Sequence, residues 1–291
     1  MTLDSVQEII DEALASKKEF WQIVLDFDME ERQVTEEQSL SKMRYIWDAM
    51  LDSVDNYQSD RRSVSGLVGG DGARMREFAG NPAALGGDYL QEVIATALSV
   101  GESNACMCKI VATPTAGACG VLPAVVVPLF KHGEASQDDI LKSLYVASGI
   151  GAVIASRASI AGAAGGCQAE IGSASAMAAG ALVALRGGSA EQIGNAVAMA
   201  LKNLMGLVCD PVAGLVEVPC VKRNVAGAVN AIACADMALA GIVSRVPVDQ
   251  VIDCMGDVGR HIPVELRETA QGGLAATPFG KSIKKKMQEG R

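Results

Sequence analysis

Three cysteines in the second half of the chain lie where helices are expected to end, and they are the residues best suited to chemistry. Cys167 follows Gly165-Gly166, Cys209 precedes Asp210-Pro211, and Cys220 follows Pro219. Glycine and proline end helices, so a side chain beside them can point toward a centre shared with other segments. No two of the three lie within one helical turn of each other, so only tertiary folding can bring them together.

We interpret these three cysteines as thiolate ligands of one iron–sulfur cluster. Three protein thiolates around a four-iron cluster leave one iron without a cysteine. A metal position that lacks a protein ligand is open to a substrate. The alternative is that all three are ordinary buried side chains, because free cysteine behaves as a small hydrophobe. We expect the other five cysteines to be structural: Cys106, Cys108, Cys119, Cys234 and Cys254.

Two glycine-rich segments could bind a small anion. Ser65–Asp71 and Thr113–Gly120 combine hydroxyl side chains with small residues that let backbone N–H groups approach a ligand. A carboxylate would suit such donors, and a plain tight turn is the alternative for each segment. Ser65–Asp71 lacks the preceding strand and the glycine spacing of a dinucleotide site.

The chain has two histidines, and neither has the neighbours that a hydrolase triad or a zinc site requires. His132 lies in Lys131-His132-Gly133, at the expected end of a helix, so we predict a surface position for it. His261 lies between Gly259-Arg260 and Pro263, in what the sequence indicates to be a shaped loop.

The elements that must position these residues are predicted to be helices. Of the 291 residues, 49% are hydrophobic and only 4% aromatic, and 31 are glycine, so the core must consist of closely packed helices with small and aliphatic side chains. Lys109–Ala112 and Val121–Val127 are the only strand candidates, and the second fits a buried helix better. We predict a mainly α fold. A helical arm over residues 1–62 would precede a large helical domain over residues 63–291.

Capping residues mark where several helices should begin. Thr35–Gln38 and Ser189–Gln192 are capping boxes, and Ser136 is a further N-cap with acidic residues after it. Asn81-Pro82 predicts an N-cap followed by proline at the first helical position. The expected helices cover Asp4–Leu14, Lys17–Arg32, Thr35–Val54, Asn81–Val100, Ser136–Ala155, Ser173 or Ser175 to Arg186, Ser189–Leu204, Asn224–Ile242 and Pro247–Met255.

Charge and hydropathy exclude several classes of partner. The net charge of −9 disfavours a nucleic-acid surface. The most apolar window, Leu144–Leu185, is interrupted by polar residues, which disfavours a membrane span. The N-terminal residues lack the basic and apolar regions of a signal peptide, so we expect a cytoplasmic protein. In that reducing compartment, eight cysteines favour free thiols or metal ligands over disulfides.

With these motifs in place, the chain resembles the α chain of the iron–sulfur-dependent bacterial L-serine dehydratases. The resemblance covers roughly residues 63–280, and its most specific block is Cys-Asp-Pro through Pro-Cys over Cys209–Cys220. The matching segments are Ser65–Asp71, Asn104–Gly120 with its Ala-Thr-Pro-Thr-Ala-Gly core, Gly165–Cys167, Asn203–Cys220, Lys222–Asn224 and Glu268–Ala275.

The resemblance implies a function and a set of site residues. Cys167, Cys209 and Cys220 would hold a [4Fe–4S] cluster whose open iron acts on the hydroxyl of L-serine, giving pyruvate and ammonia. A β subunit would complete a heterodimer or a higher oligomer, and it or His261 would supply the general base. The residues expected to bind L-serine are Ser65, Gly69, Gly70, Asp71, Asn104, Thr113, Thr115 and Gly117.

Three other functions stay open as alternatives. A cysteine desulfidase could use the same scaffold, with the iron binding a thiol instead of a hydroxyl. An iron–sulfur sensor or assembly scaffold would bind a cluster without forming pyruvate. A pyridoxal phosphate enzyme is disfavoured, because neither Lys109 nor Lys202 lies in the phosphate-cradling context that a Schiff-base lysine requires.

Overall fold

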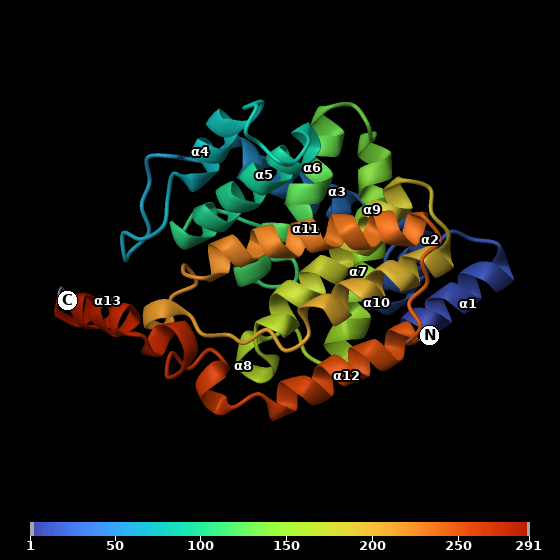
Figure 1. Cartoon of the computed structure of the whole chain (residues 1–291). Coiled ribbons are helices and arrows are strands. Elements are labelled where there is room, and N and C mark those ends of the chain that lie inside the picture. Colours follow the sequence, from blue (N-terminus) through green and yellow to red (C-terminus); the bar gives the residue numbers. More distant parts are fainter. Residues whose placement is uncertain (1–2, 290–291) are drawn as a thin grey trace.

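A computed structural model of the chain describes residues 3–289 and consists of helices joined by turns and by several longer loops (Figure 1). Within those residues the only strand-like pairing is an isolated bridge between Cys209 and Arg267. The prediction of a mainly α fold is therefore confirmed. The helices are α1 Val6–Ser16, α2 Phe20–Arg32, α3 Glu36–Asp55, α4 Asp71–Phe78, α5 Asp88–Ala105, α6 Val121–Lys131, α7 Gln137–Arg157, α8 Gly162–Gly165, α9 Ser173–Leu185, α10 Ala190–Leu204, α11 Cys220–Leu239, α12 Val248–His261 and α13 Pro278–Glu289.

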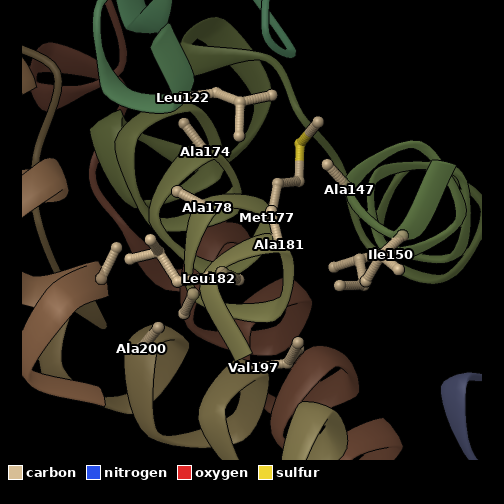
Figure 2. Close-up of a cluster of buried hydrophobic side chains, with 14 of the residues drawn as sticks. Leu122, Ala147, Ile150, Ala174, Met177, Ala178, Ala181, Leu182, Val197 and Ala200 are labelled. Carbon is tan, nitrogen blue, oxygen red and sulfur yellow. The ribbon is translucent and has the colours of Figure 1, made fainter. Parts of the chain in front are cut away.

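Helix α9 forms the centre of the bundle, because nearly every one of its residues is buried. It packs against α6, α7, α10 and α11, and Figure 2 shows its alanines facing larger side chains of these neighbours. Small side chains let helix axes approach closely. At Gly180, for example, an added Cβ would lie 2.3 Å from Cδ1 of Ile150. This explains how a chain with few aromatic residues fills its core.

The N-terminal helices α1–α3 pack onto the same core instead of standing apart. Val6, Phe20 and Trp47 belong to one continuous buried cluster with the residues of α9. The start of α1 is also tied to α12, since Ser5 Oγ donates to Asp249 Oδ2 at 2.5 Å. The segment predicted as an arm is thus docked on the remaining helices.

Most predicted helix starts are confirmed, because capping depends on neighbouring residues alone. Thr35, Ser136 and Ser189 are the N-caps of α3, α7 and α10, each with a reciprocal capping box. Val121–Val127 lies in the buried helix α6, as expected. Lys109–Ala112 forms no strand.

The predicted helix start at Asn81-Pro82 is wrong. Asn81 Oδ1 accepts from the N–H of Ala83 at 2.9 Å, so the side chain closes a local turn instead of capping a helix. Helix α5 begins only at Asp88, after Gly86-Gly87. Gln91 stabilises this arrangement by donating to the carbonyl of Gly86 at 2.6 Å.

Two later helices differ from the prediction at their ends. α11 begins at Cys220, before the predicted Asn224, and ends at Leu239, close to Gly241 with its positive φ of 85°. α12 continues past Met255 to His261, so His261 ends a helix and does not lie in a loop. Gly259 lets the last turn of α12 pack closely on α8, because an added Cβ would lie 2.9 Å from Cα of Gly165.

Helix α7 is the one helix of the described part with the length and hydropathy of a membrane span. Most of that apolar window, 67%, is buried inside the fold, where α7 packs against α9. We therefore assign α7 as a core helix.

Candidate active site

The three candidate ligand cysteines come from three separate segments and are all buried. Cys167 precedes the short π-helical turn Gln168–Gly172, Cys209 lies in the bridge to Arg267, and Cys220 is the first residue of α11. Their exposed fractions are 2%, 3% and 8%. Such a π-helical turn inside helical structure is frequent at functional sites.

The fold brings these three thiols close enough for their charges to interact. Burial raises the pKa of Cys167 to about 11. Burial, and then the charge of Cys167, raise the pKa of Cys220 to about 12. The pKa of Cys209 is raised by burial first and then by the charges of its neighbours Cys167, Glu170 and Cys220. Without a cation the three thiols resist ionisation together, whereas a metal that binds thiolates would offset that resistance.

Hydrogen bonds made by Gln168 fix the turn that carries Cys167. The N–H of Gln168 donates to the carbonyl of Leu207 at 2.9 Å, and Gln168 Oε1 accepts from the N–H of Gly206 at 2.7 Å. The same side chain donates to the carbonyl of Met255 on α12 at 3.0 Å. Gln168 therefore holds the Cys167 turn against the segment that leads into Cys209.

The Cys209 segment is held from the opposite side by the chain near Arg267. The N–H of Cys209 donates to the carbonyl of Leu266 at 2.8 Å, and the N–H of Glu268 donates to the carbonyl of Cys209 at 2.7 Å. Next along the chain, Asp210 accepts from the N–H of Leu274 at 2.8 Å. These bonds fix the backbone on both sides of the Cys209 thiol.

A half-buried carboxylate, Glu170, lies among the thiols. Its Oε1 accepts from Thr115 Oγ1 at 2.7 Å, and its Oε2 lies 4.0 Å from the sulfur of Cys209. Burial, and to a lesser degree the charge of Glu268, raise the pKa of Glu170, while the Thr115 hydroxyl lowers it. The sequence interpretation assigned no role to Glu170, because only the folded chain brings the Thr113–Gly120 segment to it.

Asn224 joins the Thr113–Gly120 segment to α11. Its Oδ1 accepts from the N–H of Gly120 at 2.8 Å, and its Nδ2 donates to the carbonyl of Gly117 at 2.8 Å. The same Nδ2 donates to the carbonyl of Cys220 at 2.9 Å. The predicted substrate residues Thr115 and Gly117 are thereby placed beside both Glu170 and the segment that carries Cys220.

The Ser65–Asp71 loop is held by two buried carboxylates of the protein itself. Glu102 on α5 accepts from the N–H groups of Gly70, Asp71 and Gly72 at 3.1, 2.8 and 3.3 Å. Glu217 accepts from the hydroxyl and, at 3.4 Å, from the N–H of Ser65. These donors, which the sequence interpretation offered to a ligand, are engaged internally, so the loop is fixed against α5 and the Cys220 segment.

The remaining predicted site residues lie in different surroundings. Thr113 is 7% exposed, and its hydroxyl has no hydrogen-bond partner among the described residues. Asn104 lies in the last turn of α5, and Gly69 lies in the loop with a φ of 134°. His261 is exposed, and its Nδ1 lies 2.8 Å from the carbonyl oxygen of Asp257. His132 is also exposed, as predicted, and pairs with Glu92 at 2.5 Å.

Three cysteine thiols are a donor set that an iron–sulfur cluster can use. Within residues 3–289, no group of three or more His, Cys, Asp or Glu side chains is arranged to hold one metal ion. In an iron–sulfur cluster each thiolate binds a different iron, so the three sulfurs need not meet at one point. Cys167, Cys209 and Cys220 lie on three separate buried segments, as such a set of ligands would.

Comparison with known proteins agrees with the motifs in this site. The family model described as serine dehydratase alpha chain matches residues 15–275. A probable L-serine dehydratase alpha chain of Bacillus subtilis is 44% identical over 283 residues, which are 97% of this chain and 94% of that protein. The L-serine dehydratase alpha chain of Peptoniphilus asaccharolyticus is 41% identical and covers 97% of both chains. A probable alpha chain of Latilactobacillus sakei is 54% identical over 68% of this chain and 94% of its own length. The chain therefore belongs to the serine dehydratase alpha chain family.

Proposed function

We propose that this chain is the α chain of an iron–sulfur-dependent L-serine dehydratase, an ammonia-lyase that forms pyruvate and ammonia from L-serine. The observation that carries the proposal is that Cys167, Cys209 and Cys220 are all buried and that hydrogen bonds of Gln168 and Arg223 tie their three segments together. Membership of the serine dehydratase alpha chain family supports the substrate, since close relatives carry that name.

Cys167, Cys209 and Cys220 would hold a [4Fe–4S] cluster in this proposal. When bound, the cluster would supply one iron without a cysteine, which is a Lewis acid suited to the substrate hydroxyl. The hydrogen bonds of Gln168 and Asn224 described above would fix the backbone segments that carry these cysteines. The guanidinium of Arg223 would stabilise the Cys167 thiolate, because its positive charge lowers the pKa that burial raises.

The reaction requires the loss of a proton and of a hydroxyl from neighbouring carbons of serine. A base takes the proton from Cα, the electron pair of that bond forms the Cα–Cβ double bond, and the Cβ–O bond breaks with release of water after protonation. The resulting aminoacrylate tautomerises to an imine, which consumes one water to give pyruvate and ammonia. The Thr113–Gly120 and Ser65–Asp71 segments would orient the substrate for this elimination.

The general base comes either from His261 or from a partner β subunit. His261 is exposed at the end of α12, where a partner could cover it. The relatives named alpha chain imply a second chain, and we propose that this chain also functions with a β subunit, in the cytoplasm. If the chain alone forms pyruvate, and His261→Asn abolishes that activity, the base belongs to this chain. Activity only after a β subunit is added would assign the base to the partner.

The test is an anaerobic purification of the chain, alone and with its β subunit, followed by three measurements. Bound iron and acid-labile sulfide should be present in near-equal amounts. Pyruvate should form from L-serine, and L-cysteine should be turned over more slowly. Faster turnover of L-cysteine would instead indicate a desulfidase, and a cluster without pyruvate formation would indicate a sensor or scaffold.

A further inference from the structure

Four carboxylates lie on the segments around Cys167, Cys209 and Cys220, and two of them accept hydrogen bonds from the protein at both oxygens. Asp210 has one oxygen on Arg223 at 2.9 Å and the other on the N–H of Leu274 at 2.8 Å. Glu217 accepts from Ser63 Oγ at 2.6 Å and from both donors of Ser65. Each oxygen of these two carboxylates thus already accepts at least one hydrogen bond from the protein.

Glu170 differs from these two because it has a single conventional donor. Thr115 donates to Oε1 at 2.7 Å, and within residues 3–289 the only donor near Oε2 is the thiol of Cys209 at 4.0 Å. A cysteine that binds a metal does so as a thiolate and donates no hydrogen bond. Among residues 3–289, Oε2 therefore has no donor at ordinary hydrogen-bond distance, and a half-buried carboxylate oxygen of this kind is suited to a cation or an N–H group.

Two glycines leave the space around this carboxylate clear. A Cβ on Gly162 would lie 2.7 Å from Glu170 Oε2 and 3.1 Å from the sulfur of Cys209. A Cβ on Gly117 would lie 3.3 Å from Glu170 Oε1. Any side chain at Gly162 would thus intrude between the carboxylate and the thiol.

We propose that Glu170, through Oε2, binds the ammonium group of the amino-acid substrate. This inference rests on the proposed function, since it assigns the substrate's amino group to a residue beside the cluster. An ammonium group carries three N–H donors and a positive charge, which match an unpaired carboxylate oxygen. Thr115 would hold the carboxylate in orientation by its hydrogen bond to Oε1.

Glu268 is the fourth carboxylate and the matched control. Its charge acts on both Glu170 and Cys209, so it lies near the same site. Its side chain is exposed, however, and water screens an exposed carboxylate. Loss of the charge at Glu268 should therefore weaken substrate binding much less than loss of the charge at Glu170.

The test compares Glu170→Gln, Glu170→Asp and Glu268→Gln in the anaerobic enzyme with its β subunit. Iron and sulfide contents are measured first. The KM for L-serine is then compared with the inhibition constant for glycerate, in which a hydroxyl replaces the ammonium group. We expect Glu170→Gln to retain the cluster and to raise the KM about 10- to 100-fold, the range for a lost charge-assisted hydrogen bond. Binding of glycerate should change by less than about threefold, because glycerate lacks the charge that Glu170 recognises.

The two other variants sharpen the comparison. Glu170→Asp keeps the charge, so its KM should lie between those of the wild type and of Glu170→Gln. Glu268→Gln should change the KM less than Glu170→Gln does. If turnover of a variant is too slow for a KM, ligand-induced change in the visible absorption of the cluster gives the same two affinities.

Four outcomes would overturn the inference. Equal weakening of L-serine and glycerate by Glu170→Gln would show that the amino group is not what Glu170 recognises. A lower kcat at unchanged KM would assign Glu170 to the chemical step, and loss of iron would assign it to cluster binding. If the wild-type enzyme with cluster and β subunit forms no pyruvate, the proposed function fails and this inference fails with it.

Discussion

Arg223 Nη2 lies 2.9 Å from Asp210 Oδ1, and this buried ion pair joins the start of α11 to the segment that carries Cys209. Arg223 also donates through Nη1 to the carbonyl of Val208 at 2.7 Å. Its side chain is 16% exposed and that of Asp210 is 5% exposed. The pair thus fixes Cys209 relative to Cys220 from within the protein.

Removing the guanidinium should destabilise the protein more than removing a neighbouring surface cation. Arg223→Met leaves Asp210 buried with one donor, and we expect a loss of about 3 kcal/mol in unfolding free energy, as for other broken buried pairs. Lys222→Met removes the adjacent cation. The Lys222 side chain is 71% exposed and pairs with Asp71, so this pair should contribute under about 1 kcal/mol to the unfolding free energy. Urea unfolding of both variants gives the comparison. Equal losses would show that the Arg223 pair is not structurally important.

Each of the three proposed ligand cysteines should be necessary for iron binding, whereas a cysteine elsewhere in the core should not. Cys167→Ala, Cys209→Ala and Cys220→Ala are each expected to lose bound iron and to lower activity by more than about 100-fold, beyond the usual effect of losing an outer-shell partner. Cys234→Ala is the control, since Cys234 is fully buried in α11 and contacts Asn203 at 3.4 Å instead of the cluster. Iron and sulfide contents of the anaerobic proteins decide the matter, and full retention of iron in any of the first three would remove that residue from the ligand set.

Local rules account for the parts of the fold that the sequence predicted well. Thr35, Ser136 and Ser189 cap helices through contacts within four residues, so their sequence neighbours suffice to identify them. Asn81 failed as a cap because the same side chain can close a turn, and Gly86-Gly87 then delays α5. Local propensity cannot choose between these two uses of an asparagine.

The candidate site was predictable only where the chain itself marks it. Glycine and proline beside Cys167, Cys209 and Cys220 indicated side chains that leave helix ends, and the structure buries all three. Glu170 and Glu102 carry no such mark, because their partners are far away in sequence: Thr115 for Glu170, and the loop near Gly70 for Glu102. The internal use of the loop donors could not be foreseen for the same reason.

Gly162 should be intolerant of even one added methyl group. Gly162→Ala would place its Cβ 2.7 Å from Glu170 and 3.1 Å from the sulfur of Cys209. A shift of either group should lower kcat/KM by about 10- to 100-fold, the effect of a small misplacement at a reacting centre. Gly87→Ala is the matched control, since its φ of −70° suits alanine and its Cβ would meet nothing within 4 Å. Wild-type kinetics for Gly162→Ala would mean that the space beside Glu170 is not used.

Glu102 should keep the Ser65–Asp71 loop in place, since it is 1% exposed and accepts from three consecutive N–H groups and from the hydroxyl of Tyr57. In Glu102→Gln one acceptor oxygen becomes an NH₂ group that faces these donors. We expect about 2 kcal/mol of lost stability, as for an unsatisfied buried group. Amide hydrogen exchange at Gly70, Asp71 and Gly72 should accelerate together, because the loop would open locally before the helices unfold.

The control for this variant is Glu92→Gln. Glu92 lies on the same helix α5, and its partly exposed carboxylate pairs with His132. Glu92→Gln should change stability by under about 1 kcal/mol and leave exchange at the loop amides as it is. Glu102→Gln should also raise the KM for L-serine if the loop orients the substrate. Unchanged exchange at all three amides in Glu102→Gln would mean that the loop is held by Glu217 alone, through the hydroxyls of Ser63 and Ser65.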